Sequence, residues 1–153
     1  MVFTLLWTLF YLLGYSSQTL SEKILWLRIK YIPSTINPII WLYFSLQFTH
    51  SKRWLNNRML RISATVYTIF TWLVVFSSDF HGWMWQKVWI EPGLPEEAVI
   101  HGFYFWIYLG VTYFALFLSF IVYTRYFVRA ASIYKKQALS MVFGSIFPLI
   151  ASI

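Results

Sequence analysis

The stretch Ala98–Thr124, AVIHGFYFWIYLGVTYFALFLSFIVYT, contains 27 residues and not one charged side chain. A helix needs about 17–25 mainly apolar residues to cross the hydrocarbon core of a bilayer, so this stretch predicts a transmembrane helix. Of all 153 residues, 59% are hydrophobic and 11% are charged, whereas a soluble domain has about a quarter charged residues. This composition excludes an ordinary soluble domain. Four more charge-free stretches have 17 to 21 residues: Met1–Ser21, Tyr31–Ser51, Ile62–Ser78 and Gln137–Ile153.

We therefore predict an all-α integral membrane protein, a single domain built as a bundle of about five transmembrane helices. The residues between the spans are too few for a separate catalytic domain of about 100 residues, so we expect no enzymatic activity in this chain. Both end helices lack a cap or a flanking charge, which predicts that the sequence is truncated at both ends. The expected spans are residues 2–17, 24–49, 60–78, 99–127 and 135–153.

The chain has no cysteine, which rules out disulfides and zinc–thiolate sites. We expect no metal and no other cofactor. Twelve basic residues exceed five acidic ones, but the basic residues cluster beside apolar spans, where they set orientation and contact anionic headgroups. The expected partner is therefore the lipid bilayer and not nucleic acid.

The charges also predict a topology. The connections at residues 50–61 and 125–136 hold eight basic and no acidic residues, so the positive-inside rule places both in the cytoplasm. The connection at 79–98 holds four acidic residues and one basic residue, which fits the outside. Lys23, Arg28 and Lys30 at the outer end of the second span are discordant, and the opposite orientation stays an alternative. The topology-setting residues are Lys52, Arg53, Arg58, Arg61, Arg125, Arg129, Lys135 and Lys136.

Two local patterns refine the helices and the outer connection. Thr19 and Glu22 form the pattern of a capping box, which predicts a helix that starts near Ser21. Pro33 and Pro38 within that helix predict a kink. In the outer connection, charged and aromatic residues alternate over residues 83–91 before a Pro-Gly pair, which predicts a small β-hairpin, with the next helix starting near Glu97.

The candidate sensing or ligand-binding residues lie mainly at this outer end. Asp79, His81 and His101 have side chains that can bind a ligand, a proton or a metal, although the alternative is hydrogen bonding to loop backbone and headgroups. Trp85, with other tryptophans, is a candidate for stacking on a ligand. An aromatic belt at the membrane interface is the alternative.

The second span carries further candidates. Trp26, Lys30 and Lys23 share one helix face, while Arg28 points elsewhere. A basic group here can receive an anionic ligand or pair with a carboxylate, and snorkelling to headgroups is the alternative. Asn37 belongs to a polar set that predicts either a small cavity near the prolines or hydrogen bonds between helices. The rest of this set is Thr35, Ser45, Gln47, Thr65, Thr68 and Thr71.

Several segments in order resemble the N-terminal seven-helix sensor region of bacterial histidine kinases. They are EKILWLRIKY (22–31), PIIWLYF (38–44), HSKRWL (50–55), SDFHGWMW (78–85), HGFYFW (101–106) and YKKQAL (134–139). The resemblance implies that the chain corresponds to helices two to six of that region. It also implies a bacterial plasma membrane location, a homodimer in the full-length receptor and an unknown small ligand. A cytoplasmic kinase or cyclase output domain is then expected in the same polypeptide.

The resulting functional hypothesis is the membrane sensor region of a two-component receptor, which detects a cue at its outer face or within the membrane. Two alternatives stay open. A small transporter or channel would use the polar residues of the second and third spans as a path. A membrane assembly subunit would use the basic inner connections to bind a partner.

Overall fold

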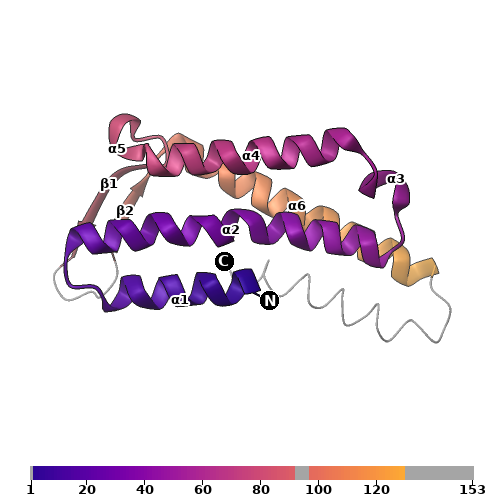
Figure 1. The fold of residues 1–153 in the computed structure, drawn as a ribbon, viewed down its shortest axis with the longest axis horizontal. Helices are drawn as coiled ribbons and strands as arrows, with labels where there is room; N and C mark the ends of the chain where they lie inside the picture. Colours follow the sequence, from indigo (N-terminus) through magenta and orange to yellow (C-terminus); the bar gives the residue numbers. More distant parts are fainter. Residues whose placement is uncertain (1, 92–96, 130–153) are drawn as a thin grey trace. The chain divides into compact units, whose positions relative to one another are not determined.

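The computed structural model describes residues 2–91 and 97–129, and it is mainly helical (Figure 1). The expected helix over residues 135–153 lies outside the described residues. The elements are α1 (Val2–Ser16), α2 (Leu20–Phe48), α3 (Lys52–Leu55), α4 (Arg58–Phe76), α5 (Ser78–His81), β1 (Trp85–Ile90), β2 (Glu97–His101) and α6 (Phe103–Arg129).

The chain divides into two compact units, and α2, α4 and α6 each contribute to both. The first unit comprises residues 1–37 and 63–109, and the second comprises residues 38–62 and 110–153. The two units are described separately below.

Two of the described helices are long and apolar enough to cross a membrane, α4 and α6 over Phe103–Val128. Large apolar side chains on both are exposed, such as Leu73 at 63% and Phe114 at 61%, as expected for surfaces that face lipid. The shorter helix α1 is apolar over 15 residues, and α2 carries four charged residues in its first eleven positions. The structure therefore supports two of the five expected spans directly.

The turn between α1 and α2 forms as the sequence predicts. The Thr19 hydroxyl accepts the backbone N–H of Glu22 at 3.3 Å, and the Glu22 carboxylate accepts the backbone N–H of Thr19 at 3.4 Å. These reciprocal bonds are the predicted capping box. Helix α2 then runs without interruption through Pro33 and Pro38, and the kink stays a prediction.

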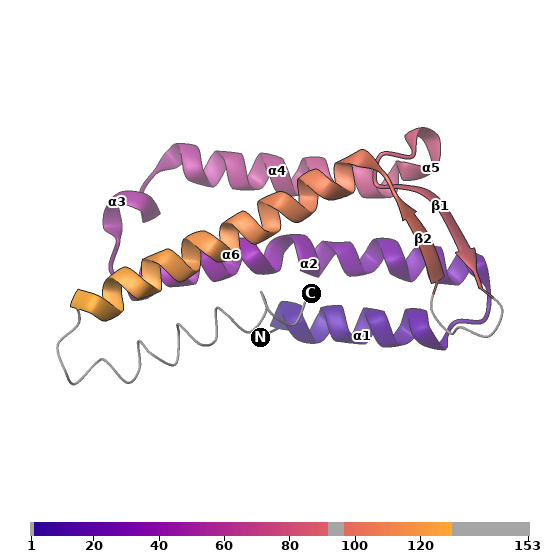
Figure 2. The same cartoon turned by 180° about the vertical axis from the view of Figure 1, so that it is seen from behind.

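The predicted hairpin is confirmed in its strands, because β1 and β2 pair antiparallel (Figure 2). The expected start of the following helix near Glu97, and of its span at residue 99, is wrong. Residues Glu97–His101 are extended and exchange backbone hydrogen bonds with β1, so α6 begins only at Phe103. The third span also ends earlier than residue 78, since α4 stops at Phe76 and Ser78 opens the separate short helix α5.

Gly102 lies between β2 and α6 and permits a very close approach of the backbone. Its N–H donates to the Met84 carbonyl at 3.0 Å, and the Tyr104 N–H donates to the Trp83 carbonyl at 2.9 Å. A Cβ built on Gly102 would lie 2.1 Å from the Trp83 carbonyl oxygen and 2.3 Å from that of Gly82. The join between hairpin and helix thus requires glycine.

Aromatic and aliphatic side chains under the hairpin form the core of the first unit. Tyr31 of α2 lies 5.8 Å from the Trp85 ring and 5.3 Å from the Tyr108 ring, both measured between centroids. Buried hydroxyls add hydrogen bonds, with Thr71 and Tyr104 oxygens 2.8 Å apart. The hairpin is therefore packed onto the helices of this unit. The cluster comprises Leu27, Val74, Val75, Met84, Trp85, Tyr104 and Tyr108.

Candidate functional site

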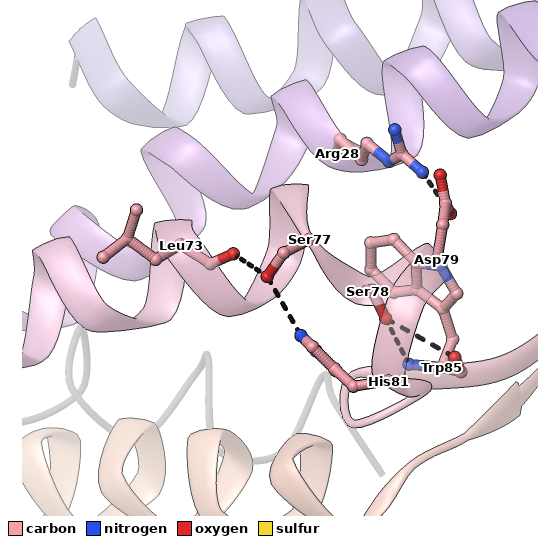
Figure 3. A network of polar contacts seen from close by, with 7 residues as sticks. All are labelled: Arg28, Leu73, Ser77, Ser78, Asp79, His81 and Trp85. Carbon is pink, nitrogen blue, oxygen red and sulfur yellow. Dashed lines mark hydrogen bonds and ion pairs between the residues drawn. The ribbon is translucent and has the colours of Figure 1, made fainter.

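The polar groups of the first unit gather where α5 and the hairpin meet α2, and we call this region the outer layer. Ser78 of α5 is 1% exposed and ties the two outer segments together (Figure 3). Its hydroxyl accepts the Trp85 N–H at 3.3 Å and lies 3.5 Å from the Trp85 carbonyl oxygen. A buried hydroxyl that satisfies backbone groups of a strand fixes the start of β1 against α5. The outer layer comprises Arg28, Lys30, Ser78, Asp79, His81, Trp85, Glu97 and His101.

His81 closes α5 with both of its ring nitrogens engaged. Its Nδ1 accepts the Trp83 backbone N–H at 3.0 Å, and its Nε2 lies 2.9 Å from the Ser77 hydroxyl, which donates to the Leu73 carbonyl at 2.5 Å. His81 thus serves to shape the loop, which matches the interpretation of hydrogen bonding to backbone.

Asp79 forms an ion pair with Arg28 of α2 (Figure 3). The Arg28 side chain is 18% exposed and that of Asp79 is 59% exposed, so solvent reaches the acidic partner. An exposed pair of this kind contributes at most about 1 kcal/mol to stability. The Asp79 carboxylate is therefore accessible to a solute in the surrounding solvent.

Lys30 forms a second, less exposed ion pair with Glu97 of β2. The Lys30 ammonium lies 3.1 Å from the Glu97 carboxylate, and the two side chains are 21% and 13% exposed. The ammonium also lies 5.6 Å from the centroid of the Tyr11 ring, so α1 contributes a cation–π contact. Of the alternatives for this lysine, the structure shows pairing with a carboxylate.

Trp26 and Lys30 lie together, as their spacing predicts, but the space beside them is small. Trp26 stacks on Phe10 of α1, with ring centroids 6.0 Å apart, and a Cβ at Gly14 would lie 3.2 Å from the Trp26 Cβ. The hollow that these residues line has a volume of about 10 Å³, which is room for one water molecule at most. Lys23 is 3% exposed and donates to the Gly14 carbonyl at 3.3 Å. This face joins α2 to α1.

Trp85 and His101 oppose each other in the hairpin, where they are register partners. Trp85 is 5% exposed and packs in the core, so it offers no open face for a ligand to stack on. His101 lies against Phe105, with ring centroids 3.7 Å apart. Partial burial lowers the pKa of the His101 imidazole from its ordinary value of 6.5, because burial disfavours the charged form.

This lowered pKa predicts that acid weakens the outer layer. Between the pKa of His101 in the folded chain and 6.5, this side chain binds a proton more readily in the unfolded chain. Its contribution to the stability of the folded state is therefore complete above pH 6.5, and it is lost as the pH falls through the folded pKa. We expect the melting temperature in detergent to fall between pH 7.5 and pH 5.5, and to fall less in His101→Gln. The control His50→Gln, in the other unit, should keep the wild-type difference. An equal fall in all three proteins would contradict the prediction.

The whole chain, residues 1–153, matches the family model described as the N-terminal 7TM region of histidine kinase. No curated protein and no solved structure gives a match. The match covers every segment on which the resemblance rests, and the long apolar helices agree with it. The chain belongs to this family.

Within this 7TM region, the remaining predicted site residues are dispersed. Asn37 is exposed and does not join the outer layer. Thr35 and Thr68 of the polar set bond to carbonyls of their own helices, those of Tyr31 at 2.7 Å and Ala64 at 2.8 Å. Thr71 instead bonds to Tyr104 of another helix, which is one of the predicted hydrogen bonds between helices. Among the described residues, no group of three or more histidine and acidic side chains converges on one point as a metal site would require.

Ser78 was not among the predicted site residues, and the sequence did not predict which partners Arg28 and Glu97 have. Ser78 joins α5 to β1, Arg28 pairs with Asp79, and Glu97 pairs with Lys30. The signal for the ion pairs was present, since ionisable residues in or beside a membrane span usually pair with one another. Ser78 had no comparable signal, because a serine after a helix is common.

Proposed function

We propose that this chain is the membrane sensor region of a two-component receptor of the bacterial plasma membrane. In this proposal the outer layer receives a cue, and the helices relay it to a cytoplasmic output domain in the same polypeptide, as a homodimer in the full-length receptor. Membership of the family supports a sensor region. It favours this function over a transporter, a channel or an assembly subunit.

The observation that carries the proposal is the double attachment of the outer layer to α2. Arg28 and Lys30 both lie on α2, whereas their partners Asp79 and Glu97 come from α5 and β2. A displacement of α5 or of β2 therefore changes the forces on α2. That helix continues to Phe48, and a helix that is biased at one end is a physical basis for signal transfer.

The ion pairs are compatible with the proposed orientation. Arg28 and Lys30 oppose the positive-inside rule if residues 79–98 lie outside, yet each has a carboxylate beside it at that end. In the folded chain both basic side chains at that end are therefore compensated by a carboxylate. The proposed topology keeps residues 50–61 and 125–136 in the cytoplasm, with residues 79–98 outside.

The two pairs differ in how a cue reaches them. The Asp79 side chain is 59% exposed, whereas that of Glu97 is 13% exposed. The hollow beside Lys30 is too small for an organic ligand. A cation or polar solute that competes for Asp79, or a physical strain on the hairpin, therefore fits the outer layer better than a ligand enclosed by Trp26.

Asp79→Asn in the full-length receptor tests this function. The variant removes the charge that holds Arg28 while it preserves side-chain size, so we expect a changed basal rate of autophosphorylation in membrane vesicles, by about threefold or more. Glu91→Gln is the matched control, because Glu91 is an exposed acid of the same connection and has no ion pair among the described residues. Wild-type output from Asp79→Asn would contradict the proposal.

A further inference from the structure

The second unit has an extreme charge balance that the outer layer does not explain. By sequence, it holds eight of the twelve basic residues of the chain and none of the five acidic ones. Every carboxylate side chain therefore belongs to the first unit. By sequence, the second unit therefore carries a net positive charge and no acidic side chain, which favours anionic partners.

The same unit contains a cavity of about 360 Å³, which is within the size range of ligand sites. Its walls are mainly apolar and come from α2, α3, α4 and α6, with Leu42, Leu46, Leu118, Val122 and Trp54 among them. Such a cavity suits a hydrocarbon chain better than a polar metabolite.

One end of the cavity is charged. Arg125 of α6 lines it, is exposed, and has no ion-pair partner among the described residues. The rings of Phe48 and Tyr126 pack 5.5 Å apart, which holds the end of α2 against α6 at this level. An apolar cavity with one free guanidinium at its edge has the two chemistries of an amphiphile.

The backbone around the cavity is well defined at this end. Helix α2 closes with His50 at a φ of +53°, while the Ser51 N–H donates to the Leu46 carbonyl at 2.9 Å and the His50 N–H to the Gln47 carbonyl at 3.0 Å. This is a Schellman motif. It turns the chain so that Ser51 and Trp54 line the cavity with Arg125.

We infer that this cavity binds one acyl chain of an anionic phospholipid, with the headgroup phosphate on Arg125. Basic pockets between transmembrane helices on the cytoplasmic side are suited to such headgroups, and the proposed topology places residues 50–61 and 125–136 on that side. The site is independent of the outer layer, and it adds a lipid cofactor to the proposed sensor function.

The headgroup, and not the chain, should determine selectivity. An acyl chain that leaves the bilayer for an apolar cavity exchanges one apolar environment for another, so the transfer gains little. A favourable charge contact near the membrane surface corresponds to about a fivefold change in affinity per basic residue. We therefore expect an anionic lipid to bind about fivefold more tightly than a zwitterionic lipid with the same chains.

Native mass spectrometry of the purified chain in a nonionic detergent tests the site. Palmitoyl-oleoyl phosphatidylglycerol and phosphatidylcholine are titrated separately, and inorganic phosphate serves as the headgroup alone. Arg125→Gln removes the charge at the cavity, and Val122→Trp fills the cavity while it keeps Arg125. The matched control is Arg58→Gln, which removes an exposed charge of the same unit that does not line the cavity.

The inference predicts that phosphatidylglycerol is retained about fivefold over phosphatidylcholine, and that Arg125→Gln and Val122→Trp each abolish this preference while Arg58→Gln keeps it. Arg125→Lys, which preserves the charge, should retain it too. Equal retention of both lipids, equal losses in Arg58→Gln and Arg125→Gln, or binding of phosphate alone would overturn the inference. Detection of a dimer of the chain in place of the lipid-bound chain would also overturn the inference. If Val122→Trp fails to fold, Leu118→Phe provides the same block.

Discussion

Gly102→Ala is expected to detach the hairpin from the start of α6. The added Cβ would overlap the carbonyl oxygens of Trp83 and Gly82, at 2.1 and 2.3 Å. Both contacts are with backbone, which cannot rotate away as a side chain can. Relief requires the loss of the hydrogen bonds from Gly102 to Met84 and from Tyr104 to Trp83. We expect a cost at the upper end of about 1–3 kcal/mol.

Thermal unfolding in detergent and protease accessibility of residues 83–101 measure this effect. Gly110→Ala is the control, since a Cβ there meets nothing within 4 Å. Because Gly110 lies inside a helix, alanine there should leave stability unchanged or raise it by up to about 1 kcal/mol. Equal melting temperatures for Gly102→Ala and the wild type would show that Gly102 does not lie so close to the carbonyl oxygens of Trp83 and Gly82.

Reversal of either charge in the Lys30–Glu97 pair is expected to have the second large effect. Lys30→Glu would place two carboxylates next to each other in a site where the side chains are only 21% and 13% exposed. Glu97→Lys would place two ammonium groups there. We expect each single reversal to cost about 2 kcal/mol, less than a fully buried pair because part of the site is solvated.

The exchanged double variant, Lys30→Glu with Glu97→Lys, should recover most of that stability, because it restores an attractive pair. The free energies of unfolding of the wild type, the two single variants and the double variant give the coupling energy directly. Lys87→Glu is the control, since Lys87 is exposed and contacts only the Trp89 ring among the interactions described. Purely additive losses in the double variant would mean that the two side chains do not interact.

Local patterns in the sequence predicted local structure well. The Thr19 and Glu22 spacing specifies hydrogen bonds over three residues, and both form. The alternation before Pro92 predicted strand β1, and its partner β2 pairs with it. The start of α6 was placed too early, because the apolar residues after Glu97 suit a helix and a strand equally and only pairing with β1 decides between them.

Contacts between distant residues were harder to predict. Arg28 and Asp79 are 51 residues apart, and Lys30 and Glu97 are 67 apart. The sequence indicates that basic residues near a membrane need partners, yet which acid each one meets depends on how α5 and β2 pack on α2. Burial is equally a property of the fold: Trp85 was a candidate for ligand stacking, and the structure places it in the core at 5% exposure.

The output of the full-length receptor under the same charge exchange tests the central claim most directly. Basal autophosphorylation is measured in membrane vesicles for wild type, Lys30→Glu, Glu97→Lys and the exchanged pair, normalised to the amount of inserted protein. If the outer layer acts on the output domain through α2, both single reversals change the rate and the exchanged pair returns it towards wild type. Wild-type rates in all four proteins, with unfolding data that show the pair is broken in the single variants, would contradict the claim.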